Sequence, residues 1–296
     1  MTDPAAKHDE GEFHGRDGVR LYYQRWLPEA APARAVIVLL HGGFAQSSWY
    51  LNLPRHEVPR GVAVYAYDQR GWGRSDGRRG YLERWSDCLD DLGAFLDLVR
   101  AAEPDRPLVL MGHTGSAPIV LEYSFQHPAS VRGVFCVSPA LDLAAIPPVL
   151  RMAANVLSRV RPRLTFDARR RVDAGMAYIS HDPDFTRFAL DDPLRNTKLT
   201  MRFIAELDAA VRRVNAQAGA LSVPVLILCG DEDRAVPPAS MRAYYERVGS
   251  PDREFHEYPG GYTNLLSDSV TDAVLADIDR WLDRVTRTSA RDCGAA

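Results

Sequence analysis

The segment Leu110-Met111-Gly112-His113-Thr114-Gly115-Ser116-Ala117 decides the fold. An apolar run over 107–111 leads into it, and a stretch with helical character over 116–127 follows. A buried strand, a tight turn and a helix in this order are typical of a nucleophile elbow, written G-x-S-x-G when it is catalytic. Thr114 stands where that pattern has its serine, and Ser116 stands where it has its second glycine. The segment therefore predicts the elbow but not its usual reactive residue.

Segments on both sides of the elbow alternate between short apolar runs and longer runs with helical spacing. The apolar runs predict buried strands, and the first strand, of mixed polarity, is expected at an edge. Strands alternating with helices predict an α/β fold with a mostly parallel, doubly wound sheet. The expected strands are 19–26, 35–40, 61–67, 107–111, 133–138, 223–229 and 253–258, and the clearest helices are 85–100, 116–127 and 270–286.

The pattern changes over 141–218, which has helical periodicity, many arginines and no convincing strand. Because it lies between two expected strands, we expect a helical cap over the strand ends, inserted after strand 6 of the sheet (133–138). Apolar cap residues such as Met152, Val156 and Phe188 would either line a pocket above the elbow or form the core of the cap. The expected organisation is a flexible tail (1–11), a core (12–140 and 219–288), the cap (141–218) and a second flexible tail (289–296).

Composition narrows the classes of function. The chain has 296 residues and a formal net charge of −3, which argues against nucleic-acid binding and against attraction to anionic membranes. We find no signal-peptide pattern and no apolar run of about 20 residues, so we expect a cytoplasmic protein with no stable membrane anchor. The four cysteines are far apart and are expected as buried small residues. We expect no metal and no cofactor, and the oligomeric state is not predicted.

Several motifs of the chain together match the pattern of a known family. They are His41-Gly42-Gly43, the stretch 67–80 that begins Tyr67-Asp68-Gln69-Arg70-Gly71, the elbow region 112–128, the cap segment 180–194 and Gly230 to Asp233. In these motifs the chain resembles the monoacylglycerol lipase and lysophospholipase branch of the α/β-hydrolase superfamily, which contains serine aminopeptidase S33-type hydrolase domains. The resemblance covers about residues 12–286 and implies the α/β-hydrolase fold.

The same resemblance locates three catalytic positions. Members of the branch have serine, aspartate and histidine there, and this chain has Thr114, Asp233 and Thr263. An alcohol needs a base before it attacks, and in the usual triad the histidine takes that proton. With threonine at 263, no imidazole is expected at that place. His41 and His113 are expected to be structural, and His181 in the cap is the least constrained histidine.

Other parts of the site are retained. Asp233 either bonds backbone amides of its turn, or serves as a general base or binds a substrate amine or hydroxyl. The oxyanion hole needs only backbone amides, which are expected from Gly43 and Gly115. Asn264, Phe44 and Phe188 are candidate substrate-binding residues.

Three functions remain open. The first is a non-hydrolytic enzyme that cyclises, eliminates or rearranges a carbonyl-containing, partly apolar small molecule. The second is a ligand-binding protein without catalysis, and the third is a weak esterase or lipase that uses Thr114. In each case the expected partner is a small molecule, bound at the elbow.

Overall fold

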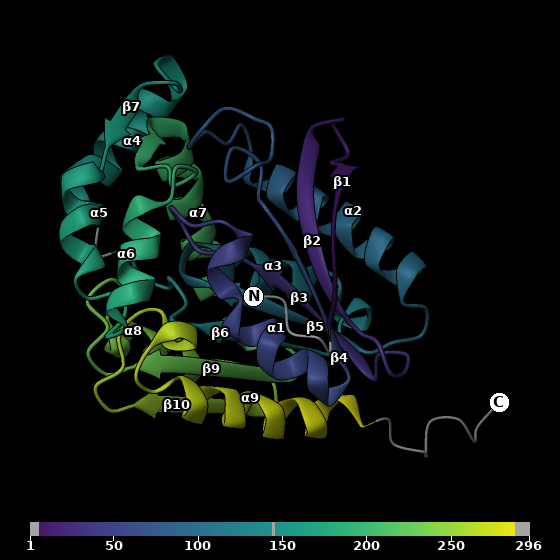
Figure 1. Cartoon of the computed structure of the whole chain (residues 1–296). Helices are drawn as coiled ribbons and strands as arrows, with labels where there is room; N and C mark the ends of the chain where they lie inside the picture. Colours follow the sequence, from purple (N-terminus) through teal and green to yellow (C-terminus); the bar gives the residue numbers. More distant parts are fainter. Residues whose placement is uncertain (1–5, 144–145, 288–296) are drawn as a thin grey trace.

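A sheet of eight strands forms the centre of the computed structural model, which describes residues 6–143 and 146–287 (Figure 1). The spatial order of the strands is β1-β2-β4-β3-β5-β6-β9-β10. The strands β3 to β10 of this sheet run parallel, and β1 and β2 add antiparallel pairings at one edge. Their bounds are β1 Ala6–His14, β2 Arg20–Pro28, β3 Ala35–Leu40, β4 Val62–Tyr67, β5 Leu108–His113, β6 Gly133–Val137, β9 Val225–Gly230 and β10 Arg253–Tyr258.

The apolar runs of the sequence form the central strands, as predicted. Every residue of β3, β4, β5, β6 and β9 is buried. Parallel strands are covered on both faces, so their side chains are apolar in both directions. The predicted and observed bounds differ by two residues or fewer for these strands. The fold is therefore the expected α/β sheet with helices on both faces.

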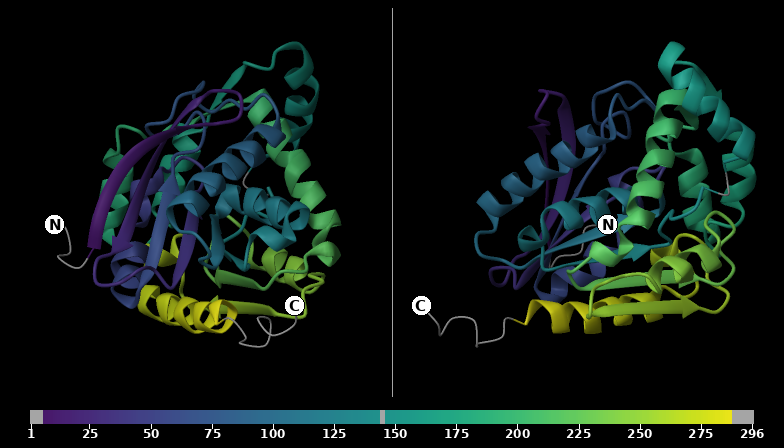
Figure 2. Two further views of the ribbon diagram at one scale, coloured as in Figure 1. Left: turned by 90° about the vertical axis from the view of Figure 1, so that its right-hand side faces the viewer. Right: turned by 180° about the vertical axis from the view of Figure 1, so that it is seen from behind.

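Helices cover the sheet in two layers, and β3 shows how they are separated. Val36, Val38 and Leu40 point to the core beneath α2, α3 and α8, whereas Ile37 and Leu39 point to the core beneath α1 and α9. Figure 2 shows the two layers from two further sides. The helices of these layers are α1 Asn52–Glu57, α2 Trp85–Ala102, α3 Ala117–Gln126, α8 Pro238–Tyr245 and α9 Thr271–Thr286. Cys88, Cys136 and Cys229 are buried, as expected, and Cys293 lies outside the described residues.

The predicted N-terminal tail over 1–11 is wrong for residues 6–11, which belong to β1. This strand pairs antiparallel with β2 from Ala6 opposite Pro28 to His14 opposite Arg20, so β2 is not the edge strand of the sheet. The polar composition concealed the strand, since backbone hydrogen bonds in an edge strand do not require apolar side chains. Residues 1–5 and the other predicted tail, 289–296, lie outside the described residues.

The chain between β6 and β9 forms a separate layer over the carboxyl ends of the strands (Figure 1). It is mainly helical, as predicted, and it also contains a small antiparallel sheet that the sequence pattern did not predict, since each of its strands has three residues. Met152 and Val156 of α4 are 67% and 63% exposed, so they do not form the core of this layer. The elements are α4 Pro148–Val160, β7 Thr165–Asp167, α5 Arg169–Met176, α6 Pro183–Asp191, β8 Lys198–Thr200 and α7 Met201–Ala216. Among the described residues, no helix is long and apolar enough to span a bilayer.

Candidate functional site

The elbow has the strained backbone that the motif predicts. Thr114 follows the last residue of β5 and has a φ of 44°, a left-handed conformation that is costly for a β-branched residue. Gly112 is required on the preceding strand because a Cβ there would lie 2.6 Å from Cγ2 of Val120 and 2.8 Å from Cα of Ala117. The helix α3 thus packs directly against the turn. A strained conformation of this kind persists only where the surrounding structure holds it.

Ser116 shows why the second glycine of the motif is dispensable. Its hydroxyl accepts a hydrogen bond from the His113 amide (2.9 Å) and lies 2.8 Å from the carbonyl oxygen of Leu40, to which it donates. The serine therefore connects the elbow to the end of β3. A glycine could not make this connection, so the substitution stabilises the turn by a different means.

Gly43 and Gly115, the two glycines expected to supply oxyanion-hole amides, lie close together. The ideal Cβ position of Gly115 is 3.9 Å from the amide nitrogen of Gly43, so the two glycines face one another across the elbow. Gly43 is exposed, and nothing lies within 4 Å of its ideal Cβ position. Within residues 6–143 and 146–287, neither amide donates to a protein acceptor. The two donors are therefore available to an oxygen from outside the protein.

Asp233 and Thr263 are in direct contact. Oγ1 of Thr263 donates a hydrogen bond of 2.8 Å to Oδ1 of Asp233. The same oxygen accepts hydrogen bonds from the amides of Ala235 (2.8 Å) and Val236 (2.9 Å). The threonine hydroxyl thus takes the hydrogen bond that a triad histidine would make to the aspartate.

The second oxygen of Asp233, Oδ2, is buried and has no well-formed hydrogen bond among the described residues, and the hydroxyl of Ser138, which interacts with this carboxyl, also lacks one. Burial raises the pKa of this carboxyl above its usual range, against the opposing effect of the hydrogen bonds from Val236, Thr263 and Ser138. A carboxylate with a raised pKa is a stronger base than an exposed one. Oδ1 of Asp233 therefore bonds the amides of its turn, as one of the two predictions has it. The role of Asp233 as a base stays a prediction.

Beneath the elbow, His113 belongs to a network that we call the elbow network (Gly42, Tyr50, His113 and Thr263). The Gly42 amide donates to the Tyr50 hydroxyl (2.7 Å), which lies 2.7 Å from Nδ1 of His113. Nε2 of His113 lies 3.1 Å from the carbonyl oxygen of Thr263. When the imidazole is neutral, only one arrangement of protons satisfies all three contacts, with Tyr50 donating to Nδ1 and Nε2 donating to Thr263. Burial lowers the pKa of His113 to about 4, so the imidazole is neutral.

The elbow network connects the loops that carry Gly42, Thr114 and Thr263, and it explains why His113 faces away from the reactive side of the turn. The sequence predicts a structural His113 but gives no sign of Tyr50, which follows no recognisable motif. The only sequence signal was indirect: a buried histidine needs a partner for each ring nitrogen.

Two other histidines have defined partners. His41 is buried, accepts a hydrogen bond from the Gln69 amide at Nε2 (3.0 Å) and contacts its neighbour's carbonyl oxygen through Nδ1 (2.8 Å). His181 is more constrained than expected: Nδ1 lies 2.7 Å from Oδ1 of Asp268, and its ring stacks on Tyr262 at 3.8 Å between centroids. His181 and Tyr262 line a cavity of about 500 Å³ beside α6. Neither histidine contacts Thr263.

The three candidate substrate-binding residues lie in different surroundings. Phe44 has a φ of 66° and packs its ring edge-on against Trp72, 6.1 Å between centroids. Phe188 of α6 is 46% exposed and lies 6.4 Å from the ring of Trp49. Asn264 is buried, and its side-chain oxygen Oδ1 has no partner among the described residues. The two phenylalanines therefore belong to separate apolar groups, and Asn264 lies next to Thr263 in the chain.

The sheet order, the elbow at the end of β5 and the helical layer inserted after β6 define the α/β-hydrolase class. The chain belongs to the serine aminopeptidase S33 family, whose model matches residues 31–269.

Its relatives include the monoacylglycerol lipase of Mycolicibacterium smegmatis, 30% identical over 280 residues that cover 94% of this chain and 98% of that protein. Human monoglyceride lipase is 28% identical and covers 92% of this chain, with 90% of its own length matched. A soluble variant of monoglyceride lipase from Saccharomyces cerevisiae, solved in complex with a substrate analog, has a TM-score of 0.84 at 22% identity and matches 97% of each chain.

Proposed function

We propose that this protein is an enzyme that binds a carbonyl-containing, partly apolar small molecule at the elbow and transforms it without a serine–histidine relay. The carbonyl oxygen would accept hydrogen bonds from the amides of Gly43 and Gly115. The observation that carries the proposal is the 2.8 Å hydrogen bond from Thr263 to Asp233, which fills the place of the imidazole base. A rearrangement, cyclisation or elimination needs an oxyanion site and a proton acceptor but no covalent acyl intermediate.

Asp233 is the proposed proton acceptor. Its Oδ2 is buried and has no well-formed hydrogen bond among the described residues, the Ser138 hydroxyl is a donor that interacts with the carboxyl, and burial raises the pKa of the group. Thr263 holds the other oxygen in place, so a substrate proton would transfer to a carboxylate of fixed orientation. Thr114 would position the substrate beside the oxyanion amides.

A second candidate is hydrolysis of a small acyl ester, with the Thr114 hydroxyl as nucleophile. Membership in a hydrolase family and the likeness to monoacylglycerol lipases favour this candidate. These relatives support it better than they support the non-hydrolytic candidate. Its weak point is chemical, because Thr114 has no imidazole partner to accept its proton.

Assays of monoacylglycerols and p-nitrophenyl esters of graded chain length distinguish the two. The non-hydrolytic candidate predicts no ester cleavage above the rate of the Thr114→Ala variant. Hydrolysis by Thr114 predicts turnover that falls at least about 100-fold in Thr114→Ala and is unchanged in Thr165→Ala, a matched control on exposed β7. Turnover that survives Thr114→Ala would contradict a threonine nucleophile.

A double variant tests whether the scaffold still supports triad chemistry. Thr114→Ser combined with Thr263→His is expected to gain esterase activity, whereas Thr114→Ser alone is not, because the serine still lacks its base. Ligand-induced thermal stabilisation by a monoacylglycerol, with no product detected by mass spectrometry for any carbonyl compound tried, would instead indicate binding without catalysis.

A further inference from the structure

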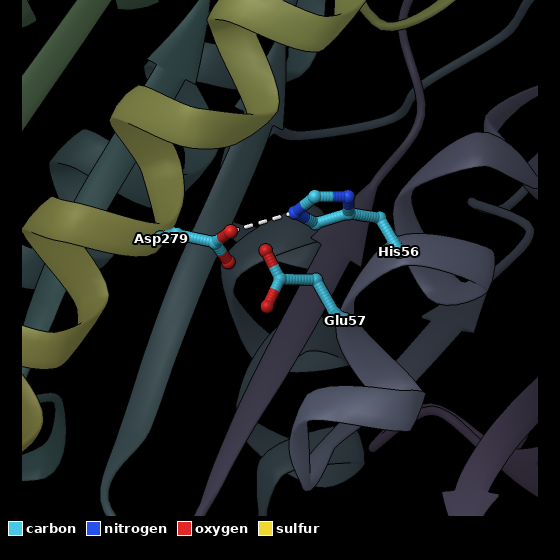
Figure 3. Close-up of side chains that lie close together, drawn as sticks. All are labelled: His56, Glu57 and Asp279. Carbon is cyan, nitrogen blue, oxygen red and sulfur yellow. Dashed lines mark hydrogen bonds and ion pairs between the residues drawn. The ribbon is translucent and has the colours of Figure 1, made fainter.

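A second polar cluster lies between α1 and α9, at the opposite end of the sheet from the elbow. His56 and Glu57 end α1, a few residues before β4 begins, and Asp279 lies in α9. Figure 3 shows the side chains of all three pointing into the space between the two helices. We call this group the α1–α9 cluster. It shares no residue with the elbow network and takes no part in the proposed function.

Glu57 is the unusual member of the α1–α9 cluster. Its side chain is completely buried, and neither of its carboxylate oxygens has a hydrogen-bond partner among the described residues. Oδ1 of Asp279 is likewise buried and unpartnered. Burial, with a further contribution from Asp279, raises the pKa of Glu57 to about 8. Buried carboxylates normally have partners, so three unsatisfied oxygens at one place indicate a missing cation or proton.

The donor atoms suit a metal ion. One donor atom from each of His56, Glu57 and Asp279 lies within 4.8 Å of the other two. Ligand atoms on tetrahedral zinc are about 3.4 Å apart, given bonds of about 2.1 Å, so small side-chain rotations would complete the site. The side chains of His56 and Asp279 are 20% and 26% exposed, which leaves an entry path and room for a water ligand.

Neighbouring charges permit this binding. Nε2 of His56 (2.7 Å) and Nε of Arg60 (3.2 Å) both contact Oδ2 of Asp279. Arg60 can keep Oδ2 while the unpartnered Oδ1 turns to the metal and His56 exchanges its hydrogen bond for a coordinate bond. Arg34 is paired with Asp283 at 2.9 Å. Two carboxyl groups and an imidazole therefore face the ion.

We propose that His56, Glu57 and Asp279 bind a divalent transition-metal ion of the zinc type, which joins the end of α1 to α9. One imidazole and two carboxylates, with water in the fourth position, form a ligand set that zinc accepts. Magnesium and calcium are expected to bind more weakly, because they prefer all-oxygen ligand sets.

Zinc titration of the full-length, untagged, chelator-treated protein tests the proposal. Calorimetry is expected to show one zinc ion per chain, and the midpoint of thermal unfolding is expected to rise with zinc concentration. Glu57→Gln and His56→Gln should each weaken binding at least about 10-fold. His14→Ala, which removes an exposed histidine of β1, should bind as the wild type does.

Other outcomes overturn the proposal. If zinc binds equally to the wild type, Glu57→Gln and His56→Gln, the ion lies elsewhere. If no saturable binding occurs at pH 7.5, Glu57 and Asp279 share a proton instead. If magnesium raises the unfolding midpoint as much as zinc does, the site is not selective for transition metals. Glu57→Leu, which removes the buried carboxyl and should fold, must lose the zinc response even if the Gln variants prove unstable.

Discussion

The elbow network and the α1–α9 cluster each contain a buried or half-buried histidine, yet their polar atoms differ in one respect. In the elbow network, each ring nitrogen of His113 has a partner, and the protons can be arranged in only one way. In the α1–α9 cluster, three carboxylate oxygens have none among the described residues. A satisfied network fixes the positions of its loops. An unsatisfied network can still bind an ion or a proton. The elbow network therefore holds its loops in place, whereas the α1–α9 cluster has oxygens that can bind a further group.

Removing the imidazole of His113 should give the largest effect. His113→Ala leaves the Tyr50 hydroxyl and the Thr263 carbonyl unsatisfied and opens a cavity, so we expect the free energy of unfolding to fall by about 3–5 kcal/mol. Urea denaturation at pH 7.5 measures this. His56→Ala in chelator-treated protein should cost less than about 1 kcal/mol, since its ion pair is partly exposed. Equal losses in the two variants would remove the distinction between the clusters.

The same network should make stability depend on pH. Burial of the His113 ring lowers its pKa from 6.5 to about 4, so this histidine binds a proton more readily in the unfolded chain than in the folded one. The contribution of this group is therefore complete above pH 6.5 and is lost as pH falls to about 4, by about 3 kcal/mol. Comparing the wild type with His113→Asn across this range isolates the effect, because the variant lacks the titrating group. A parallel pH dependence in both proteins would show that His113 is not kept neutral by the fold.

Glu57 should behave in the opposite way in the metal-free protein. Glu57→Leu replaces an unsatisfied buried carboxyl by an apolar side chain of similar volume, so we expect a gain of about 1–2 kcal/mol in the free energy of unfolding at pH 8. Chemical denaturation in the presence of a chelator measures it. A loss of stability would mean that the carboxyl already has a favourable partner in the folded protein.

The comparison also shows what could be read from the sequence. Buried strands such as β3 were predictable because parallel strands are continuous apolar runs, and the backbone at Thr114 followed from its motif. Tyr50 and Glu57 were not predictable, since their roles depend on neighbours that are distant in the chain: Thr263 through His113 for the first and Asp279 for the second. The polar strand β1 was missed for a related reason, because its stability comes from pairing with β2 and not from its own side chains.

Substitutions of Thr114 itself should give the smallest change in stability. They test how firmly the elbow network holds the turn above it. Its φ of 44° is unfavourable for a β-branched residue and permitted for glycine. Thr114→Gly should therefore raise the free energy of unfolding by about 0.5–1 kcal/mol, and Thr114→Ser by less. If the turn relaxes when the network is broken, the gain from Thr114→Gly should shrink toward zero in a His113→Ala background. A double-mutant cycle measured by urea denaturation gives this coupling. An undiminished gain would show that β5 and α3, and not His113, hold Thr114 in its strained conformation.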